Sequence, residues 1–311
     1  MTAKRWAFSG ALTIALGFSA SSFAAPYVAD SFSYTLGSDL NGQNGGSGFG
    51  SAWSFTTAIG SGQPTPTAKV VAGLSLNGLV SSGNAARISA GLGSKDNIGT
   101  LGRNFGNTTP SNSNLWGAFL IRQDSALAIG SFGDGTRFAS EFNSGNGRKF
   151  FAEAKHNDAW DSTYDARVGT EKNPNASNGN FSIADGTTYL VVTKFENIRY
   201  GAYTGNVTNV RMWILGQSNV NSVFNNGLTE TSLNNHNQTT FGQSFNPEFG
   251  VSGLIASEPL NLVAQRGTAD FDELRWGTTL NDVVVLIPEP TSVGLLGLAG
   301  VGLLARRRRS A

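Results

Sequence analysis

Residues 186–195 read GTTYLVVTKF, and residues 207–215 read VTNVRMWIL. Both runs combine β-branched, aromatic and long apolar side chains, which fit the pleated and half-buried surface of a strand. A Gly-Thr-Thr signal opens the first run, and Trp213 lies near the centre of the second. The two segments predict a core strand and its neighbour in the same sheet.

Shorter patterns elsewhere in the chain support a fold built from strands. Residues 115–122 form an apolar run that is too short for a helix. Phe138, Ser140 and Phe142 alternate with Arg137, Ala139 and Glu141, which gives a period of two. Residues 143–148 carry turn signals and lead into residues 149–154, which predicts a hairpin. Residues 219–238 are polar and rich in Asn, so we expect a long loop there with room for one helical turn.

Glycine and asparagine dominate residues 37–53, which Trp53 closes. Such a segment is expected to be an irregular loop with several positive-φ positions. Its Gly46-x-Gly48-x-Gly50 string is followed by no helical pattern, which argues against a phosphate-binding loop. We expect Trp53, Trp116, Trp213 and Trp276 to lie in the core.

The N-terminal residues have the pattern of a secretory signal peptide. Lys4 and Arg5 precede an apolar core at residues 7–18, and Ser22-Phe23-Ala24 fits a small-residue cleavage site. Signal peptidase is therefore an expected partner, with the mature chain beginning at Ala25 or Pro26. The alternative, an N-terminal membrane helix, fits less well because the apolar run is short.

The C-terminal residues have three features in order. Pro288, Glu289 and Pro290 come first, an uncharged apolar run follows at residues 291–305, and Arg306, Arg307, Arg308 and Arg309 complete the pattern. Arginines stop translocation and hold their end on the cytoplasmic side. Fifteen helical residues span about 22 Å, less than a bilayer core of about 30 Å. We expect a weak transmembrane helix that is meant to be removed; the alternative is an ordinary tail anchor.

Composition excludes several classes of function. These two terminal segments contain six of the 22 basic residues and one of the 21 acidic residues. The rest of the chain therefore has 16 basic and 20 acidic residues, a net charge of −4. No nucleic acid partner is expected from a mildly acidic body. The chain contains no cysteine, so an exported product would rely on an ordinary core rather than on disulfides.

Two resemblances extend these inferences. The C-terminal pattern of residues 288–309 resembles the PEP-CTERM sorting signal, which implies processing by an exosortase and a producer of extracellular polysaccharide. The opening DSFSY at residues 30–34, the loop at 37–53, the two strands quoted first and ADFDELRWGTT at 269–279 resemble concanavalin A-like or laminin G-like domains. That resemblance implies a jelly-roll sandwich of two antiparallel sheets.

Catalytic patterns are poorly represented. Glycoside hydrolysis needs paired carboxylates, and the E-x-D-x-x-E string of glucanases with this fold does not occur. Glu141 and Glu153 could face each other across the predicted hairpin, but solvated positions beside basic residues are the simpler interpretation. His156 and His236 lie in polar surroundings far apart in the sequence, so we expect both in exposed loops. We expect a protein that is not an enzyme.

Two kinds of ligand site stay open. Calcium prefers oxygen ligands, which Asp158, Asp161 and Asp165 could supply, as could the group Asp270, Asp272 and Glu273. No other cofactor is expected. A glycan would use an aromatic face beside hydrogen-bonding groups. The best candidates for glycan binding are Trp160 with Asn157, Asp158, Asp161 and Tyr164.

The sequence therefore predicts an all-β protein in three parts: a signal peptide at 1–24, a sandwich domain at 25–287 and a sorting signal at 288–311. We expect export to the cell envelope or extracellular matrix, with transient anchoring in the inner membrane. The expected role is structural or adhesive in exopolysaccharide or biofilm, with extracellular polysaccharide as a partner. The alternative is a glycan-binding lectin or a glucanase-like enzyme.

Overall fold

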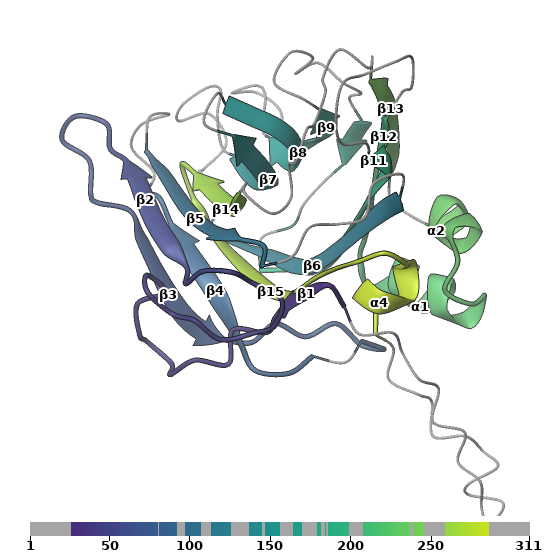
Figure 1. Cartoon of the computed structure of the whole chain (residues 1–311), viewed down its shortest axis with the longest axis horizontal. Helices are drawn as coiled ribbons and strands as arrows, with labels where there is room; N and C mark the ends of the chain where they lie inside the picture. Colours follow the sequence, from purple (N-terminus) through teal and green to yellow (C-terminus); the bar gives the residue numbers. More distant parts are fainter. Residues whose placement is uncertain are drawn as a thin grey trace, which may run out of the picture.

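Two antiparallel β-sheets pack face to face in the computed structural model (Figure 1). The described residues are 26–79, 81–91, 97–106, 113–125, 137–144, 147–155, 164–169, 179–181, 184, 186–198, 208–236, 239–245 and 259–285. This arrangement is the predicted all-β sandwich with two antiparallel sheets.

The larger sheet has eight strands in the order β13-β12-β11-β6-β15-β4-β3, and β1 pairs with β15 beside β4. Its strands are β1 (Val28–Asp30), β3 (Thr67–Ala72), β4 (Asn84–Ser89), β6 (Ser113–Ser125), β11 (Thr188–Ile198), β12 (Thr208–Leu215), β13 (Thr239–Phe245) and β15 (Thr268–Gly277).

The smaller sheet has seven strands in the order β10-β9-β8-β7-β14-β5-β2. They are β2 (Ser54–Ala58), β5 (Ile98–Asn104), β7 (Arg137–Ser144), β8 (Gly147–Lys155), β9 (Tyr164–Gly169), β10 (Gly179–Phe181) and β14 (Pro259–Gln265). The chain passes from this sheet to the larger one several times, the last time through the short β14–β15 connection.

Strand pairing confirms the local patterns in the sequence. β11 and β12 are antiparallel neighbours, with Val192 opposite Trp213, as the two apolar runs predict. β7 and β8 form the predicted hairpin. In that hairpin Glu141 lies opposite Phe151 and Glu153 opposite Ala139, so the two glutamates are diagonal rather than direct neighbours.

The main core lies between the two sheets, because alternate side chains of each strand point toward the opposing sheet. From the larger sheet it includes Phe119, Phe271 and Trp276, and from the smaller sheet Leu101 and Leu262. All four tryptophans predicted to be in the core are buried, with exposed fractions of 6% or less. Each aromatic side chain removes a large apolar area from water, which is the main favourable term in folding.

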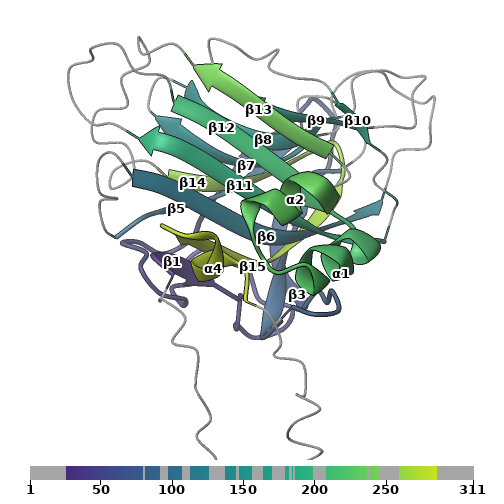
Figure 2. The same ribbon diagram turned by 90° about the vertical axis from the view of Figure 1, so that its right-hand side faces the viewer.

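A second core lies on the other face of the larger sheet, where helices cover it (Figure 2). The helices are α1 (Gln217–Asn225), α2 (Glu230–His236) and α4 (Leu280–Val283). The predicted long loop at 219–238 is therefore wrong, because most of that segment forms α1 and α2. The side chains of Val220, Val223 and Leu233 are buried against the sheet. This packing stabilises the two helices despite the polar composition of the segment. His236, predicted in a loop, ends α2.

Ionic contacts hold α2 over the sheet. Glu230, the first residue of α2, accepts hydrogen bonds from Lys194 Nζ at 2.7 Å and Arg211 Nη1 at 2.7 Å. Lys194 also lies 5.1 Å from the ring centre of Trp116, which stacks on Trp213. These contacts tie the first turn of α2 to the neighbouring strands β11 and β12.

Residues 37–53 form the predicted irregular loop, and Gly37, Gly42, Gly46 and Gly48 all have positive φ. Residues 27–36 carry aromatic and β-branched side chains that favour a strand, but within them only Val28–Asp30 form one. The expected transmembrane helix lies outside the described residues. Within them, every helix is too short or too polar to cross a bilayer.

Candidate functional site

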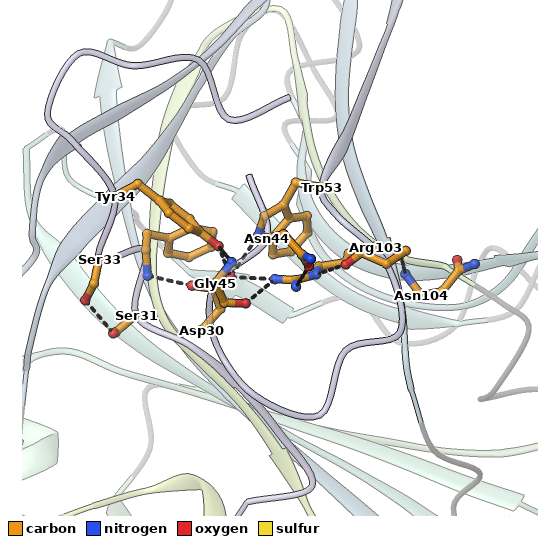
Figure 3. Close-up of polar contacts among 11 residues, drawn as sticks. Asp30, Ser31, Ser33, Tyr34, Asn44, Gly45, Trp53, Arg103 and Asn104 are labelled. Atoms are coloured by element: carbon orange, nitrogen blue, oxygen red, sulfur yellow. Dashed lines mark hydrogen bonds and ion pairs between the residues drawn. The ribbon is translucent and has the colours of Figure 1, made fainter. Parts of the chain in front are cut away.

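A buried charge centre joins the N-terminal loop to the smaller sheet (Figure 3). Asp30, at the end of β1, is 2% exposed. Its Oδ2 atom accepts hydrogen bonds from Tyr34 Oη at 2.7 Å, Trp53 Nε1 at 2.8 Å and Arg103 Nη1 at 3.0 Å. Its Oδ1 atom accepts the Phe32 backbone N–H at 2.8 Å. One carboxylate therefore binds β1, the loop and β5 together.

Arg103 is the cation of this centre and is 3% exposed. Besides Asp30, its guanidinium donates to the Gly45 carbonyl at 2.7 Å, to Asn44 Oδ1 at 2.7 Å and to the Ser51 carbonyl. The guanidinium also lies 4.2 Å from the ring centre of Phe49. A buried ion pair is stable only when further hydrogen bonds satisfy both partners, and this pair meets that condition.

Tyr34 shows how strongly this centre acts on its neighbours. Burial, followed by the Asp30 charge and the hydrogen bond to Asp30, raises the pKa of Tyr34 to about 12. Its hydroxyl also accepts the Gly45 N–H at 3.0 Å. Tyr34 thus stays protonated and acts as a fixed donor, and the centre adds side-chain contacts to the isolated backbone bridges that hold this irregular loop.

Asp270, a residue of the second predicted calcium group, is held by arginines. It is fully buried on β15. Arg87 Nε donates to its Oδ1 at 2.7 Å, and Arg122 Nη2 donates to its Oδ2 at 2.7 Å. Two cations already balance this carboxylate, so the arrangement disfavours a metal ion at Asp270.

Asp272 and Glu273 point to separate partners. Asp272 accepts the backbone N–H groups of Leu74 at 2.8 Å and Glu273 at 2.7 Å. Glu273 accepts from the Ser82 N–H and from Arg275 Nη2 at 2.8 Å. Within the described part of the chain, no three acidic or histidine side chains converge as a metal site.

Burial raises the pKa of Asp272 to about 8, and the charges of Glu273 and Asp30 add to this effect. The two backbone N–H donors act in the opposite direction. A perturbed carboxyl group beside a pocket is a common feature of active sites. A pocket of about 220 Å³ does lie nearby, lined by Asp30, Gly46, Ser47, Glu273 and Arg275 among others, but Asp272 is not part of its lining.

The predicted glycan site falls largely outside the described residues. Asn157, Asp158, Trp160 and Asp161 belong to the connection between β8 and β9, which is not described. Tyr164 and Asp165 begin β9, where they lie opposite Phe181 and Asn180 of β10. The glycan site and the first calcium group, Asp158, Asp161 and Asp165, therefore stay predictions.

Sequence reasoning missed the buried charge centre. The segment 30–34 served only as a landmark of the fold, and no role was expected for Asp30 or Arg103. A faint signal exists, since a strand-ending Asp before a glycine-rich loop is a natural hydrogen-bond acceptor. Its cation lies 73 positions away in the chain, and no local pattern connects the two.

The sorting segment directly follows the last described residues. Its proline motif and arginines, Pro288–Pro290 and Arg306–Arg309, lie outside the described residues, which end at Val285. The chain is packed on the fold until just before that point, because Val283 and Val284 are each 2% exposed. The predicted motif is thus attached to a fixed edge of the sandwich.

Three solved structures with a similar chain path are distant in sequence. The seed lectin of Lotus tetragonolobus is 11% identical over 78% of this chain and 96% of its own, with a TM-score of 0.41. A carbohydrate esterase from the Shiga toxin-encoding bacteriophage phi24B is 14% identical over 78% and 97%, with a TM-score of 0.39. An alginate lyase from Pseudomonas aeruginosa is 11% identical over 63% and 83%, with a TM-score of 0.34. Similarity this low says nothing about activity or ligand.

No curated protein matches the chain. Residues 286–309 match the family model described as the PEP-CTERM protein-sorting motif. This match covers the proline motif, the apolar run and the four arginines that the sequence singled out. It implies export, transient membrane anchoring and cleavage by exosortase. The chain carries a PEP-CTERM sorting motif behind a β-sandwich of two antiparallel sheets.

Proposed function

We propose that this protein is a non-catalytic surface or matrix component, exported and then released from its membrane anchor by exosortase. Its role is structural or adhesive in exopolysaccharide or biofilm material. The observation that carries the proposal is the sorting motif placed directly after a sandwich whose buried carboxylates are bound by the protein's own groups. We take residues 25–287 as one domain that is delivered in this way.

Four buried carboxylates of the described region support a structural role. Hydrolysis of a glycoside requires two carboxyl groups that flank a bond in an open cleft. Asp30, Asp270 and Asp272 are at most 2% exposed, and Glu273 is 7% exposed. Each accepts hydrogen bonds from side-chain or backbone donors of the fold, which leaves them in poor positions to act on a polymer in solution.

A carbohydrate-active enzyme is the second candidate, and the raised pKa of Asp272 is the observation in its favour. A general acid must hold its proton near neutral pH and reach the leaving group. Asp272 meets the first condition, but it lies outside the lining of the neighbouring pocket. Incubation of the mature protein with exopolysaccharide from its producer tests this candidate. We expect no new reducing ends and no unsaturated products, and either one would refute the non-catalytic assignment.

Binding without catalysis is a separate part of the proposal. Trp160, with Asn157, Asp158, Asp161 and Tyr164, is proposed to contact polysaccharide, and Asp158, Asp161 and Asp165 are proposed to bind calcium. A polysaccharide pull-down with and without EDTA tests both ideas. Trp160→Ala should weaken retention while Trp53→Phe, a core change, should not. Equal retention of all variants argues against this glycan site.

The decisive experiment follows the protein in its producer with and without the exosortase. We expect the mature chain in the matrix fraction of the intact strain, with a C-terminus upstream of Arg306 by mass spectrometry. Loss of the exosortase should leave the full-length form in the inner membrane. An unprocessed chain that reaches the matrix would contradict the proposed route, and a matrix unchanged by deletion of this gene would contradict the structural role.

A further inference from the structure

The two ends of the described chain lie side by side. β1 pairs with the last part of β15, where Val28 lies opposite Trp276 and Asp30 opposite Leu274. Residues 277–285, which include α4, continue from that point. Figures 1 and 2 show β1 and α4 on the same side of the molecule. We call β1 together with residues 277–285 the α4 pole.

The chain is firmly attached to the fold at this pole. Asp282 Oδ2 accepts the backbone N–H groups of Thr278 at 3.0 Å and Thr279 at 2.7 Å. Leu280, Val283 and Val284 are buried with exposed fractions of 8%, 2% and 2%. The anchor therefore begins at a fixed point of the sandwich, immediately after Val284.

The length of the tether limits how far the pole can stand from the bilayer. The apolar run begins at Thr291, seven residues after Val284, and seven extended residues reach at most about 25 Å. The headgroup layer takes about 5 Å or more of that length on each side of the hydrocarbon core. The pole therefore lies within about 20 Å of the headgroups while the run is inserted.

The surface of the pole suits such an approach. Its exposed side chains include Thr278, Thr279 and Asn281, which carry no charge. The charged residues beside it, Glu273 and Arg275, form an ion pair at 2.8 Å with side-chain exposures of only 8% and 19%. Burial of an unpaired charge is the main free-energy cost of such a contact. Contact between the pole and the lipid headgroups would bury none.

We propose that the α4 pole rests on the lipid headgroups of the membrane until the sorting segment is cleaved. The β14–β15 connection then lies at the end of the sandwich away from the anchor. Ile59 marks that far end, since the next residue, Gly60, donates to Asn97 Oδ1 at 2.9 Å and Asn97 accepts the Arg266 N–H at 3.1 Å. β15 separates the two ends by about 30 Å. This inference rests on the membrane-anchored stage of the proposed function and depends on no ligand.

Single-cysteine labels test the orientation cleanly, because the natural chain contains no cysteine. Asn281→Cys and Ile59→Cys each place one fluorophore at an exposed position, the first at the α4 pole and the second at the far end, where Ile59 is 48% exposed. The chain from Ala25 to Ala311 is reconstituted in phosphatidylcholine vesicles with a spin-labelled headgroup quencher. We expect quenching severalfold stronger at position 281 than at position 59.

A chain that stops at Val285 should lose vesicle binding and the quenching at both positions, with an unchanged circular dichroism spectrum. Equal quenching at the two positions, or stronger quenching at position 59, would overturn the orientation. Absence of quenching at both positions in vesicle-bound full-length chain would overturn the contact. If quenching at position 281 requires exosortase in the vesicles, the pole contacts the enzyme and the proposed contact with lipid is wrong.

Discussion

Asp30 and Asp272 are two buried carboxylates on opposite faces of the larger sheet, and their surroundings differ. Asp30 faces the smaller sheet and is compensated by Arg103 at 3.0 Å. Asp272 lies on the helix-covered face and accepts the backbone N–H groups of Leu74 and Glu273, at 2.8 and 2.7 Å. The pairing with Arg103 lets the buried Asp30 join segments that are distant in the sequence. Asp272 accepts backbone N–H groups instead, and burial remains the dominant effect on the pKa of its carboxyl group.

The largest effect is expected where that compensation is removed. Arg103→Ala leaves Asp30 buried without its cation and should lower the free energy of unfolding by about 3–5 kcal/mol. Lys69→Ala is the matched control, because Lys69 and Asp39 form an exposed pair at 2.6 Å whose loss should cost less than about 1 kcal/mol. Urea denaturation of the mature chain measures both. Similar losses would show that the Asp30 centre is no more important than a surface pair.

The loop held by Asp30 should be almost as sensitive. A Cβ atom at Gly48 would lie 1.9 Å from the Tyr27 carbonyl oxygen, at a φ of +78°. Gly48→Ala should therefore destabilise the protein by about 3 kcal/mol. Gly42 has a φ of +86° but open space around it, so Gly42→Ala should cost only about 1 kcal/mol. Thermal unfolding of the two variants would contradict this account if Gly42→Ala proved the more damaging.

Asp272 should make the free energy of unfolding depend on pH. Its folded-state pKa of about 8 exceeds the ordinary value of 3.8, so the folded protein binds the proton more tightly than the unfolded chain. This contribution to stability is complete below about pH 4 and is lost as the pH rises through 8. Between pH 6 and 8 the loss should amount to about 2 kcal/mol. Asp272→Asn should flatten this slope in urea titrations, and an unchanged slope would assign it to another group.

The smallest effect concerns the α4 pole. Asp282→Ala removes the acceptor for Thr278 and Thr279, and loss of such a cap costs about 1 kcal/mol. The change should act locally, so hydrogen exchange at the Val284 N–H, which bonds the Leu280 carbonyl at 3.0 Å, should accelerate. Exchange in β8, a strand of the smaller sheet, serves as the control. Equal acceleration in β8 would mean that the change weakens the whole sandwich.

Local patterns were sufficient for several parts of the fold. The pairing of β11 with β12 and the β7–β8 hairpin follow from runs of strand-forming residues separated by turn signals. The segment 219–238 was predicted wrongly because its composition is polar. Its fully buried apolar residues in α1 and α2 are only Val220, Val223 and Leu233, which pack against the sheet. A helix stabilised mainly by packing leaves a weak signal in the sequence.

By itself, the sequence determined the sorting motif, the strand-rich class and the burial of the tryptophans, because each depends on residue type within a short window. Only the tertiary structure decided that Asp30 pairs with Arg103, that Asp270 is held by two arginines and that the first strand lies beside the exit to the anchor. Those contacts join segments separated by tens to hundreds of residues. Their energies come from burial and mutual neutralisation of charge, which exist only once both sheets have packed.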